Sequence, residues 1–106
     1  MLFIKLADVP QKEIVPGYHG RFVHTEHNTV SYWDVEAGAT LPEHAHMHEQ
    51  TSIVLEGKFE LTVAGEAHLL EPGEWALIPP DVPHSGKALT ACTLMDIFYP
   101  VREDYR

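Results

Sequence analysis

Side chains that bind metal ions recur at every second position of the segment 44–50. His44, His46, His48 and Gln50 occupy these positions, in a chain that holds eight histidines among 106 residues. In an extended strand such side chains share one face, and their Cα atoms lie about 6.5–7 Å apart. Two imidazoles at that spacing can reach one ion with bonds of roughly 2.0–2.1 Å. The segment therefore predicts a metal site on one face of a strand.

A further ligand has to come from another strand, and His84 is the candidate. It follows the proline-rich turn 79–83, which restrains the backbone before it. The position of His48 leaves three roles open: supporting a ligand, contacting a substrate or facing solvent. The remaining histidines are expected on the surface: His19, His24, His27 and His68.

The elements that position these residues are expected to be short strands. Turn residues recur about every 8–12 positions with apolar alternation between them, which is typical of a β-sandwich or barrel. Segments 51–55 and 58–63 flank Glu56-Gly57 and indicate a hairpin with one buried face. We expect an all-β double-sheet roll. The expected strands are 3–6, 21–26, 29–35, 50–55, 58–63, 67–70, 75–78 and 88–99. Strand 3–6 has few neighbours to pair with, so we expect it to add to a partner's sheet in a homodimer.

The composition limits the classes of function. A chain of this length forms one domain, and its 44% hydrophobic residues suffice for one core. Its net charge of −9 argues against nucleic acid and anionic membranes as partners. An anionic substrate would need positive charge from an arginine or a metal ion. Cys92 is the single cysteine, which excludes an internal disulfide. The apolar runs are too short for a membrane helix or a signal peptide, so a cytoplasmic location is expected.

The histidine segment resembles the first sequence motif of the cupin superfamily. That motif reads glycine, five residues, His-x-His, three or four residues, glutamate, six residues, glycine. Here Gly38, His44, His46, Gln50 and Gly57 stand at those spacings, with glutamine in place of the usual glutamate.

A second motif stands at the spacing that the same superfamily shows. It reads glycine, five residues, Pro-x-Gly, two residues, histidine. Gly73, Pro79 and His84 match it, whereas Asp81 replaces the second glycine and Ala88 the asparagine that closes some versions.

This resemblance implies a cupin double-stranded β-helix, a jelly-roll barrel with one divalent metal inside. A single cupin domain would span 1–106, with motifs at 38–57 and 73–88 and a closing strand and tail at 88–106. His44, His46, Gln50 and His84 fall on the ligand positions. Four neutral ligands would leave the ion its full charge, which favours an anionic ligand and differs from the two-histidine-one-carboxylate iron site. The ligand types accept Zn, Ni, Fe, Mn or Cu, so the sequence does not name the metal.

The C-terminal segment carries a narrower resemblance. Leu-Met-Asp96-Ile-Phe98 and Pro-Val-Arg102-Glu-Asp-Tyr, together with His-Met-His-Glu-Gln, are similar to small single-domain cupins of uronate catabolism, the KdgF pectin-degradation type. The likeness implies ring opening and tautomerisation of 4,5-unsaturated uronate monosaccharides to linear 5-keto-4-deoxyuronate. Asp96 would then shuttle a proton, and Arg102 would bind the carboxylate of a small anionic sugar. Phe98, with Trp75 or Trp33, would form an apolar wall, and His48 would contact the substrate.

Other interpretations of these residues stay open. Asp96 would be inert if it pointed outward, and Arg102 would be inert in a surface ion pair. Two other functions compete with the sugar enzyme: an iron-dependent dioxygenase acting on a small organic substrate, and a cupin that binds a small ligand without catalysis. Dependence on oxygen would identify the first, and binding without product would identify the second.

Overall fold

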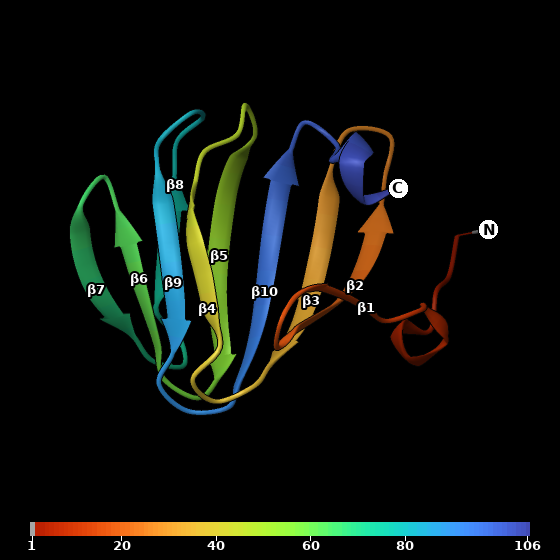
Figure 1. The fold of residues 1–106 in the computed structure, drawn as a ribbon. Helices are drawn as coiled ribbons and strands as arrows, with labels where there is room; N and C mark the ends of the chain where they lie inside the picture. The colour runs from red at the N-terminus through yellow and green to blue at the C-terminus, as the bar shows by residue number, and fades with distance from the viewer. Residues whose placement is uncertain (1) are drawn as a thin grey trace.

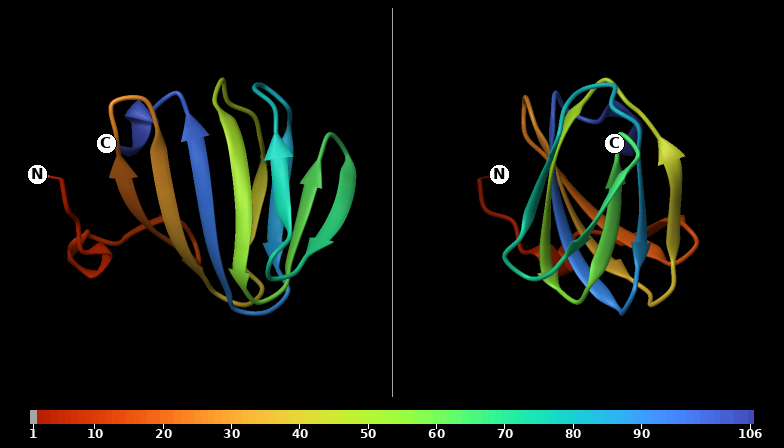
Figure 2. Two further views of the ribbon diagram at one scale, coloured as in Figure 1. Left: turned by 180° about the vertical axis from the view of Figure 1, so that it is seen from behind. Right: turned by 90° about the vertical axis from the view of Figure 1, so that its left-hand side faces the viewer.

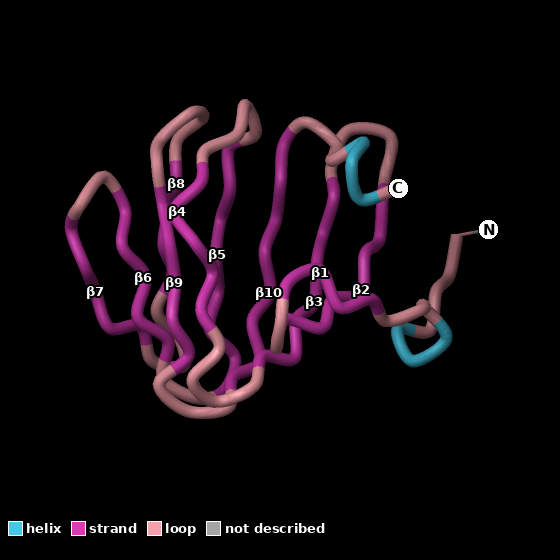
Figure 3. Tube along the Cα trace, in the orientation of Figure 1, coloured by secondary structure: helices cyan, strands magenta, loops and turns pink. Residues whose placement is uncertain are grey.

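Ten antiparallel strands make up most of the protein (Figure 1). The computed structural model describes residues 2–106, and two short 3-10 helices lie near the ends of the chain (Figure 3). The strands are β1 (Lys12–Val15), β2 (Tyr18–His24), β3 (Thr29–Val35), β4 (Thr40–His44), β5 (Glu49–Glu56), β6 (Phe59–Val63), β7 (Glu66–Leu70), β8 (Trp75–Ile78), β9 (His84–Ala88) and β10 (Cys92–Tyr99); the helices are η1 (Leu6–Asp8) and η2 (Glu103–Tyr105). Among residues 2–106, no helix has the length and apolarity needed to cross a membrane.

The strands form two sheets that face one another across the interior (Figure 2). The larger sheet has the order β1-β2-β3-β10-β5-β8, and the smaller has the order β4-β9-β6-β7. This arrangement is the all-β jelly roll that the sequence predicts, so the expected fold class is confirmed.

The interior is filled by alternate residues of both sheets. In β10, Leu94, Asp96 and Phe98 are buried between more exposed neighbours, which is the period of two expected when one face of a strand is covered. Trp33 and Phe22 pack edge to face with ring centroids 5.3 Å apart, an arrangement that aromatic pairs favour. The barrel thus has a packed aromatic core, and Asp96 is an acidic group placed inside it.

The predicted hairpin around Glu56-Gly57 is wrong. β5 pairs with β10 and β8 in the large sheet, whereas β6 pairs with β7 and β9 in the small one. Gly57 has a φ of +85°, and a Cβ there would collide with the carbonyl oxygen of Ala91. This left-handed residue takes the chain from one sheet to the other. The tight hairpin lies one turn later, between β6 and β7.

Two other strand predictions need correction. Segment 3–6 is not a strand, because residues 2–5 have no regular secondary structure and η1 begins at Leu6. Segment 88–99 is divided into β9 and β10, which belong to different sheets. Gly86 lies inside β9, where the Phe59 ring occupies the space that a Cβ would take. Strands β1 and β4 were not predicted.

Candidate metal centre

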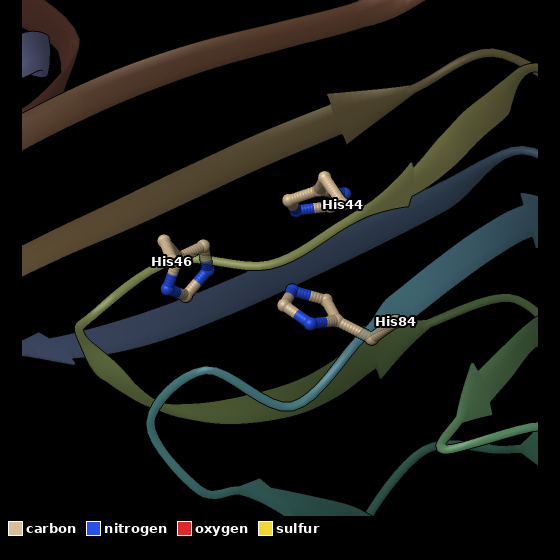
Figure 4. A group of neighbouring side chains, drawn as sticks. All are labelled: His44, His46 and His84. Carbon is tan, nitrogen blue, oxygen red and sulfur yellow. The ribbon is translucent and has the colours of Figure 1, made fainter.

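Three histidines from separate segments meet at one end of the barrel (Figure 4). His44 ends β4 and His84 begins β9, and the two are direct partners in the small sheet. His46 lies in the loop 45–48 that joins β4 to β5. One ring nitrogen from each histidine lies within 4.8 Å of the other two. Such a cluster is a natural cage for one ion.

The strand argument that suggested this cluster is only partly right. His44 and Gln50 lie on strands β4 and β5, but the chain between them is a bend and not a continuous strand. Equal spacing along one strand therefore does not bring His44 and His46 together. The loop turns the His46 ring back toward His84, with ring centroids 5.0 Å apart.

Backbone carbonyls fix the orientation of each imidazole. The Nδ1 atoms of His44, His46 and His84 lie 2.9, 3.0 and 2.9 Å from the carbonyl oxygens of Pro42, His48 and Val82. A carbonyl only accepts hydrogen bonds, so each Nδ1 carries the proton. A neutral imidazole then has its lone pair on Nε2, which is the tautomer that a metal ligand requires.

The chemistry of the Nε2 atoms fits a cation. His84 Nε2 is buried and has no hydrogen-bond partner among residues 2–106. His46 Nε2 lies 3.1 Å from Gln50 Oε1, so a lone pair faces a carbonyl-type oxygen. Burial, together with the charge of Arg102 and the neighbouring His84, lowers the pKa of His46 to about 4. Neutral imidazoles and an amide oxygen directed at one another suit a divalent ion better than a proton.

A second group of polar residues lies deeper in the same interior. Asp96 is only 8% exposed, at the centre of β10 between Ser31 of β3 and Ser52 of β5. Burial raises its pKa to about 6, although the polar groups of Ser52, Gln50 and Trp33 and the charge of Arg102 oppose the shift. Gln50 Nε2 donates to Ser52 Oγ at 2.9 Å. Ser52 therefore lies between Asp96 and Gln50, which is one of the candidate metal ligands.

Arg102 is held between two aromatic rings. Its guanidinium carbon lies 4.7 Å from the Phe98 ring centroid and 4.1 Å from that of Tyr105. Its Nε and Nη2 donate to the two carboxylate oxygens of Asp104 at 2.9 and 2.7 Å. Nη1 takes no part in this ion pair. Arg102 is 7% exposed, so its charge is directed into the barrel and is not part of a solvated surface pair.

One cavity of about 60 Å³ brings these groups together. Asp96, Phe98, Arg102 and Ser52 line it, and most of the other lining residues are aliphatic or aromatic. The candidate metal ligands on its wall are His44, Gln50 and His84. The combination of a cation site, an arginine and a buried carboxyl can bind an anion and move a proton beside it.

Two residues predicted to contact a substrate are not in the cavity wall. Trp75 is 61% exposed, because it takes an outward position on the edge strand β8. His48 is half-buried: its carbonyl accepts from His46 Nδ1, and its ring lies 6.5 Å from that of Phe98. Trp33 lines the cavity as part of the core. Its indole donates to Ser31 Oγ at 2.8 Å.

The sequence did not single out Asp104, Tyr105 or Tyr18. Asp104 and Tyr105 follow Arg102 closely in the C-terminal tail. This closeness in sequence was the available indication that both contact its guanidinium. Tyr18 lines the cavity, and its buried hydroxyl has no hydrogen-bond partner among residues 2–106. Tyr18 begins a strand whose start was placed three residues too late, so the sequence offered no clue to it.

The remaining histidines have structural surroundings. His27 and His68 are exposed, as expected. His24 is half-buried and bonds Thr29 Oγ1 at 2.8 Å. His19 Nε2 lies 2.8 Å from Glu36 and 3.7 Å from Glu13 on the outer surface. His19, Glu13 and Glu36 form a second cluster of possible metal ligands. The contact with Glu36 raises the pKa of His19, so an ordinary ion pair accounts for this cluster.

Similarity to known proteins agrees with the geometry. Quercetin 2,3-dioxygenase of Bacillus subtilis (strain 168) is 47% identical over 49 residues, which is 45% of this chain. The chain spans only 14% of the length of that relative. An RmlC-like cupin from Shewanella frigidimarina is 29% identical with a TM-score of 0.94, covering 100% of this chain and 96% of that one. KdgF from a Halomonas species is 27% identical with a TM-score of 0.92, covering 98% and 97%.

The Cupin domain family matches residues 31–98. That range includes all four ligand positions as well as Asp96 and Phe98. Because the match covers more than half of the chain, this protein belongs to the cupin family.

Proposed function

We propose that this protein is a metal-dependent enzyme that opens the ring of 4,5-unsaturated uronate monosaccharides. The observation that carries the proposal is the shared cavity, which Asp96 and Arg102 line together with His44, Gln50 and His84. The similarity to KdgF supports it, because the likeness extends over nearly the whole of both chains. The substrate class is an anion, and Arg102 provides positive charge within a chain of net charge −9.

The proposed reaction rearranges the sugar without changing its formula. The anomeric hydroxyl loses its proton, the C1–O5 bond breaks, and C1 becomes an aldehyde. The C4–C5 double bond then belongs to an enolate at C5. Addition of the proton at C4 gives the linear 5-keto-4-deoxyuronate. No oxidant or reductant is needed, so the residues have only to orient the sugar and move protons.

Arg102 orients the substrate in this proposal. Asp104 occupies Nε and Nη2, so Nη1 remains to bind the uronate carboxylate. Phe98 packs against the guanidinium and the His46 ring, which narrows the space available to the sugar. His44, His46, Gln50 and His84 would hold a divalent ion, which would supply a second positive charge and polarise substrate oxygens.

Asp96 moves the proton in this proposal. With a pKa of about 6, its carboxyl is close to the midpoint between acid and base near neutral pH. Such a group takes a proton from the anomeric hydroxyl and returns it to C4 with only a small free-energy difference in either step. An exposed aspartate with an ordinary pKa would be a poor acid at the same pH.

A turnover assay tests the proposal. Metal-loaded protein is mixed with 4,5-unsaturated galacturonate, the loss of ultraviolet absorbance is followed, and the linear product is identified by NMR. We expect acceleration over the spontaneous reaction that a chelator abolishes and that Asp96→Asn lowers by at least about 100-fold. The matched control is Glu60→Gln, an exposed carboxylate outside the cavity. No acceleration with the metal bound, or full activity in Asp96→Asn, would overturn the proposal.

A second candidate function is oxygen-dependent cleavage of a small organic substrate. Its support is the local identity of 47% to a quercetin 2,3-dioxygenase, which covers part of this chain. The two candidates differ in what they need. The four proposed ligands include no carboxylate, unlike the two-histidine-one-carboxylate iron site. Ring opening contains no redox step and therefore consumes no oxygen. Activity that is lost without air would favour the oxygenase, whereas equal rates with and without air would favour ring opening.

A further inference from the structure

The end of the β2–β3 hairpin lies against the C-terminal tail. His24 ends β2 and Thr29 begins β3, and the two are direct partners in the large sheet. Thr29 is completely buried, and the backbone N–H of Arg102 donates to its Oγ1 at 2.8 Å. His24 Nε2 lies 3.3 Å from the carbonyl oxygen of Tyr105. Two residues of one hairpin therefore hold both ends of the turn 102–105.

The protons of these contacts have one consistent arrangement when the imidazole is neutral. The Tyr105 carbonyl only accepts hydrogen bonds, so His24 Nε2 carries the proton and Nδ1 carries the lone pair. Thr29 Oγ1 lies 2.8 Å from that Nδ1 and therefore donates its hydroxyl proton to it. The same oxygen accepts from the N–H of Arg102. Each donor of the chain meets an acceptor, and a satisfied buried network of this kind holds the backbone in one position.

The turn that the hairpin holds carries the groups around the Arg102 guanidinium. Tyr105 N donates to the Arg102 carbonyl oxygen at 3.1 Å, which closes the turn. The Tyr105 ring packs on Phe22 of β2 with centroids 4.5 Å apart, and the helix η2 lies beside the end of β2 (Figure 1). Asp96 lies within β10, whereas Arg102 lies in the tail. A shift of the turn would therefore move the guanidinium relative to the carboxyl of Asp96.

We propose that His24 is a positioning residue for the substrate carboxylate, acting through Thr29 and the Tyr105 carbonyl on the turn that carries Arg102. This role rests on the proposed function, in which Arg102 Nη1 binds that carboxylate. A planar guanidinium binds a carboxylate well only at a defined position and angle. Asp104 fixes the plane of the guanidinium, and His24 fixes the turn from which it extends. The end of the β2–β3 hairpin thus belongs to the substrate site, although His24 does not line the cavity.

Steady-state kinetics of His24→Phe tests the proposal. Phenylalanine keeps a ring of similar size and removes both hydrogen bonds. We expect kcat/KM to fall about 10-fold through a higher KM, with kcat changed less than about 2-fold. His24→Asn should recover part of the loss, because its Oδ1 can accept from Thr29 as Nδ1 does. His27→Phe is the control, since His27 is an exposed histidine in the turn of the same hairpin. A wild-type KM in His24→Phe, or an equal loss in His27→Phe, would overturn the proposal.

Binding of galacturonate separates this proposal from the proposed function. Galacturonate carries the carboxylate but has no C4–C5 double bond, so it binds without undergoing the rearrangement. Its Kd, measured by calorimetry on metal-loaded protein, should rise about 10-fold in His24→Phe and stay unchanged in His27→Phe. This rise in Kd, with a wild type that does not accelerate ring opening, would overturn the proposed function and support the positioning role. An unchanged Kd in His24→Phe, or a wild type that does not bind galacturonate, would overturn the positioning role.

Nitrogen NMR of the histidine rings tests the proton arrangement in the wild type itself. At about pH 8, above the ordinary imidazole pKa of about 6.5, the nitrogen shifts of a neutral ring identify which nitrogen carries the proton. We expect Nε2–H on His24, the opposite of the Nδ1–H expected on His44 in the metal-free protein. Thr29→Ser keeps the hydroxyl and should keep the His24 signals, whereas Thr29→Val should shift the Nδ1 signal. A proton on His24 Nδ1 would overturn the proposal.

Discussion

Arg102 and Asp104 form a bidentate ion pair in which both carboxylate oxygens accept from the Nε–Nη2 edge of the guanidinium, at 2.9 and 2.7 Å. The two residues differ in their surroundings, because the arginine side chain is 9% exposed and the aspartate side chain 57%. Burial of the arginine and the contact with Asp104 have opposite effects, and the net result is a raised pKa of Arg102. Asp104 thus holds a cavity residue in place from the outside.

Asp104→Asn should weaken substrate binding without touching the metal centre. An amide offers one acceptor where the carboxylate offers two, so the guanidinium loses its fixed plane. We expect kcat/KM to fall about 10-fold, which corresponds to about 1.4 kcal/mol, mainly through a higher KM. Steady-state kinetics and metal titration of the same samples measure the two effects separately.

Glu103→Gln is the matched control for that substitution. Glu103 is the exposed neighbour of Asp104, and it contacts Arg106 and not Arg102. Equal losses in the two variants would mean that the tail acts only through its overall charge. An unchanged KM in Asp104→Asn would contradict the positioning role.

Metal binding should stabilise the fold through His84. An ion that binds only the native state adds about 2.7 kcal/mol to the free energy of unfolding when its concentration is 100 times Kd. Thermal unfolding with and without added zinc should therefore show a clear rise in Tm for the wild type and none for His84→Ala. His84→Ala itself leaves a small void and removes a hydrogen bond to Val82, so its own Tm without metal is the reference.

His68→Ala is the control for the metal experiment. His68 is an exposed histidine of β7 whose Nε2 lies 3.1 Å from Glu66 Oε1. It should keep the full rise in Tm. If His84→Ala kept the rise as well, the ion would be bound somewhere other than the three-histidine cluster.

The sequence predicted which histidines lie together better than it predicted the backbone that carries them. The spacing of the first cupin motif is kept by Gly38, His44, His46, Gln50 and Gly57. Such a spacing identifies residues that lie close together in the fold, and it does so without specifying the secondary structure between them. The argument from strand periodicity failed at 45–48, because a chain that crosses between two sheets has to bend. Periodicity reports which face is buried, and it contains no information about which sheet a strand joins.

The failed hairpin and the misplaced Trp75 have the same origin. Phe59 and Leu61 of β6 are buried on either side of the exposed Glu60, as the alternation predicts, but Gly57 directs β5 and β6 into opposite sheets. Trp75 was assigned to the cavity by its residue type, whereas its position in β8 turns it outward. Asp96 could be placed by its shared parity with Phe98, because both lie on one strand without a bend between them.

The hydroxyl of Tyr18 should cost stability where it stands. It is buried without a hydrogen-bond partner among residues 2–106, and burial raises the pKa of this phenol. A buried polar group without a partner costs about 1–3 kcal/mol. Tyr18→Phe keeps the ring contacts with Trp33 and Phe59, so we expect it to raise the free energy of unfolding by about 1 kcal/mol.

Urea unfolding of Tyr18→Phe beside Tyr32→Phe measures this effect. Tyr32 lies on the outward face of β3 and is only half-buried, so its hydroxyl reaches solvent in both states and its loss should be nearly neutral. A loss of stability in Tyr18→Phe would show that its hydroxyl is hydrogen-bonded in solution.

Asp96 should make the metal-free fold less stable as the pH rises. Its pKa is about 6 in the folded protein against 3.8 for the ordinary group. Between these values the folded state holds more protons than the unfolded chain, so the free energy of unfolding falls with increasing pH. The contribution present below about pH 4 is lost as the pH passes 6, and a shift of this size corresponds to about 3 kcal/mol.

The pH effect is isolated by comparing the wild type with Asp96→Asn. Asparagine has a similar shape and cannot ionise, so the wild type should lose stability relative to the variant between about pH 4 and pH 6. Above pH 7 the difference should become constant. Urea unfolding of metal-free samples at pH 4.5, 6 and 7.5 supplies the three points needed. A difference that does not vary with pH would mean that the Asp96 carboxyl is hydrated or paired in solution, and it would remove the basis for its role as a proton carrier near neutral pH.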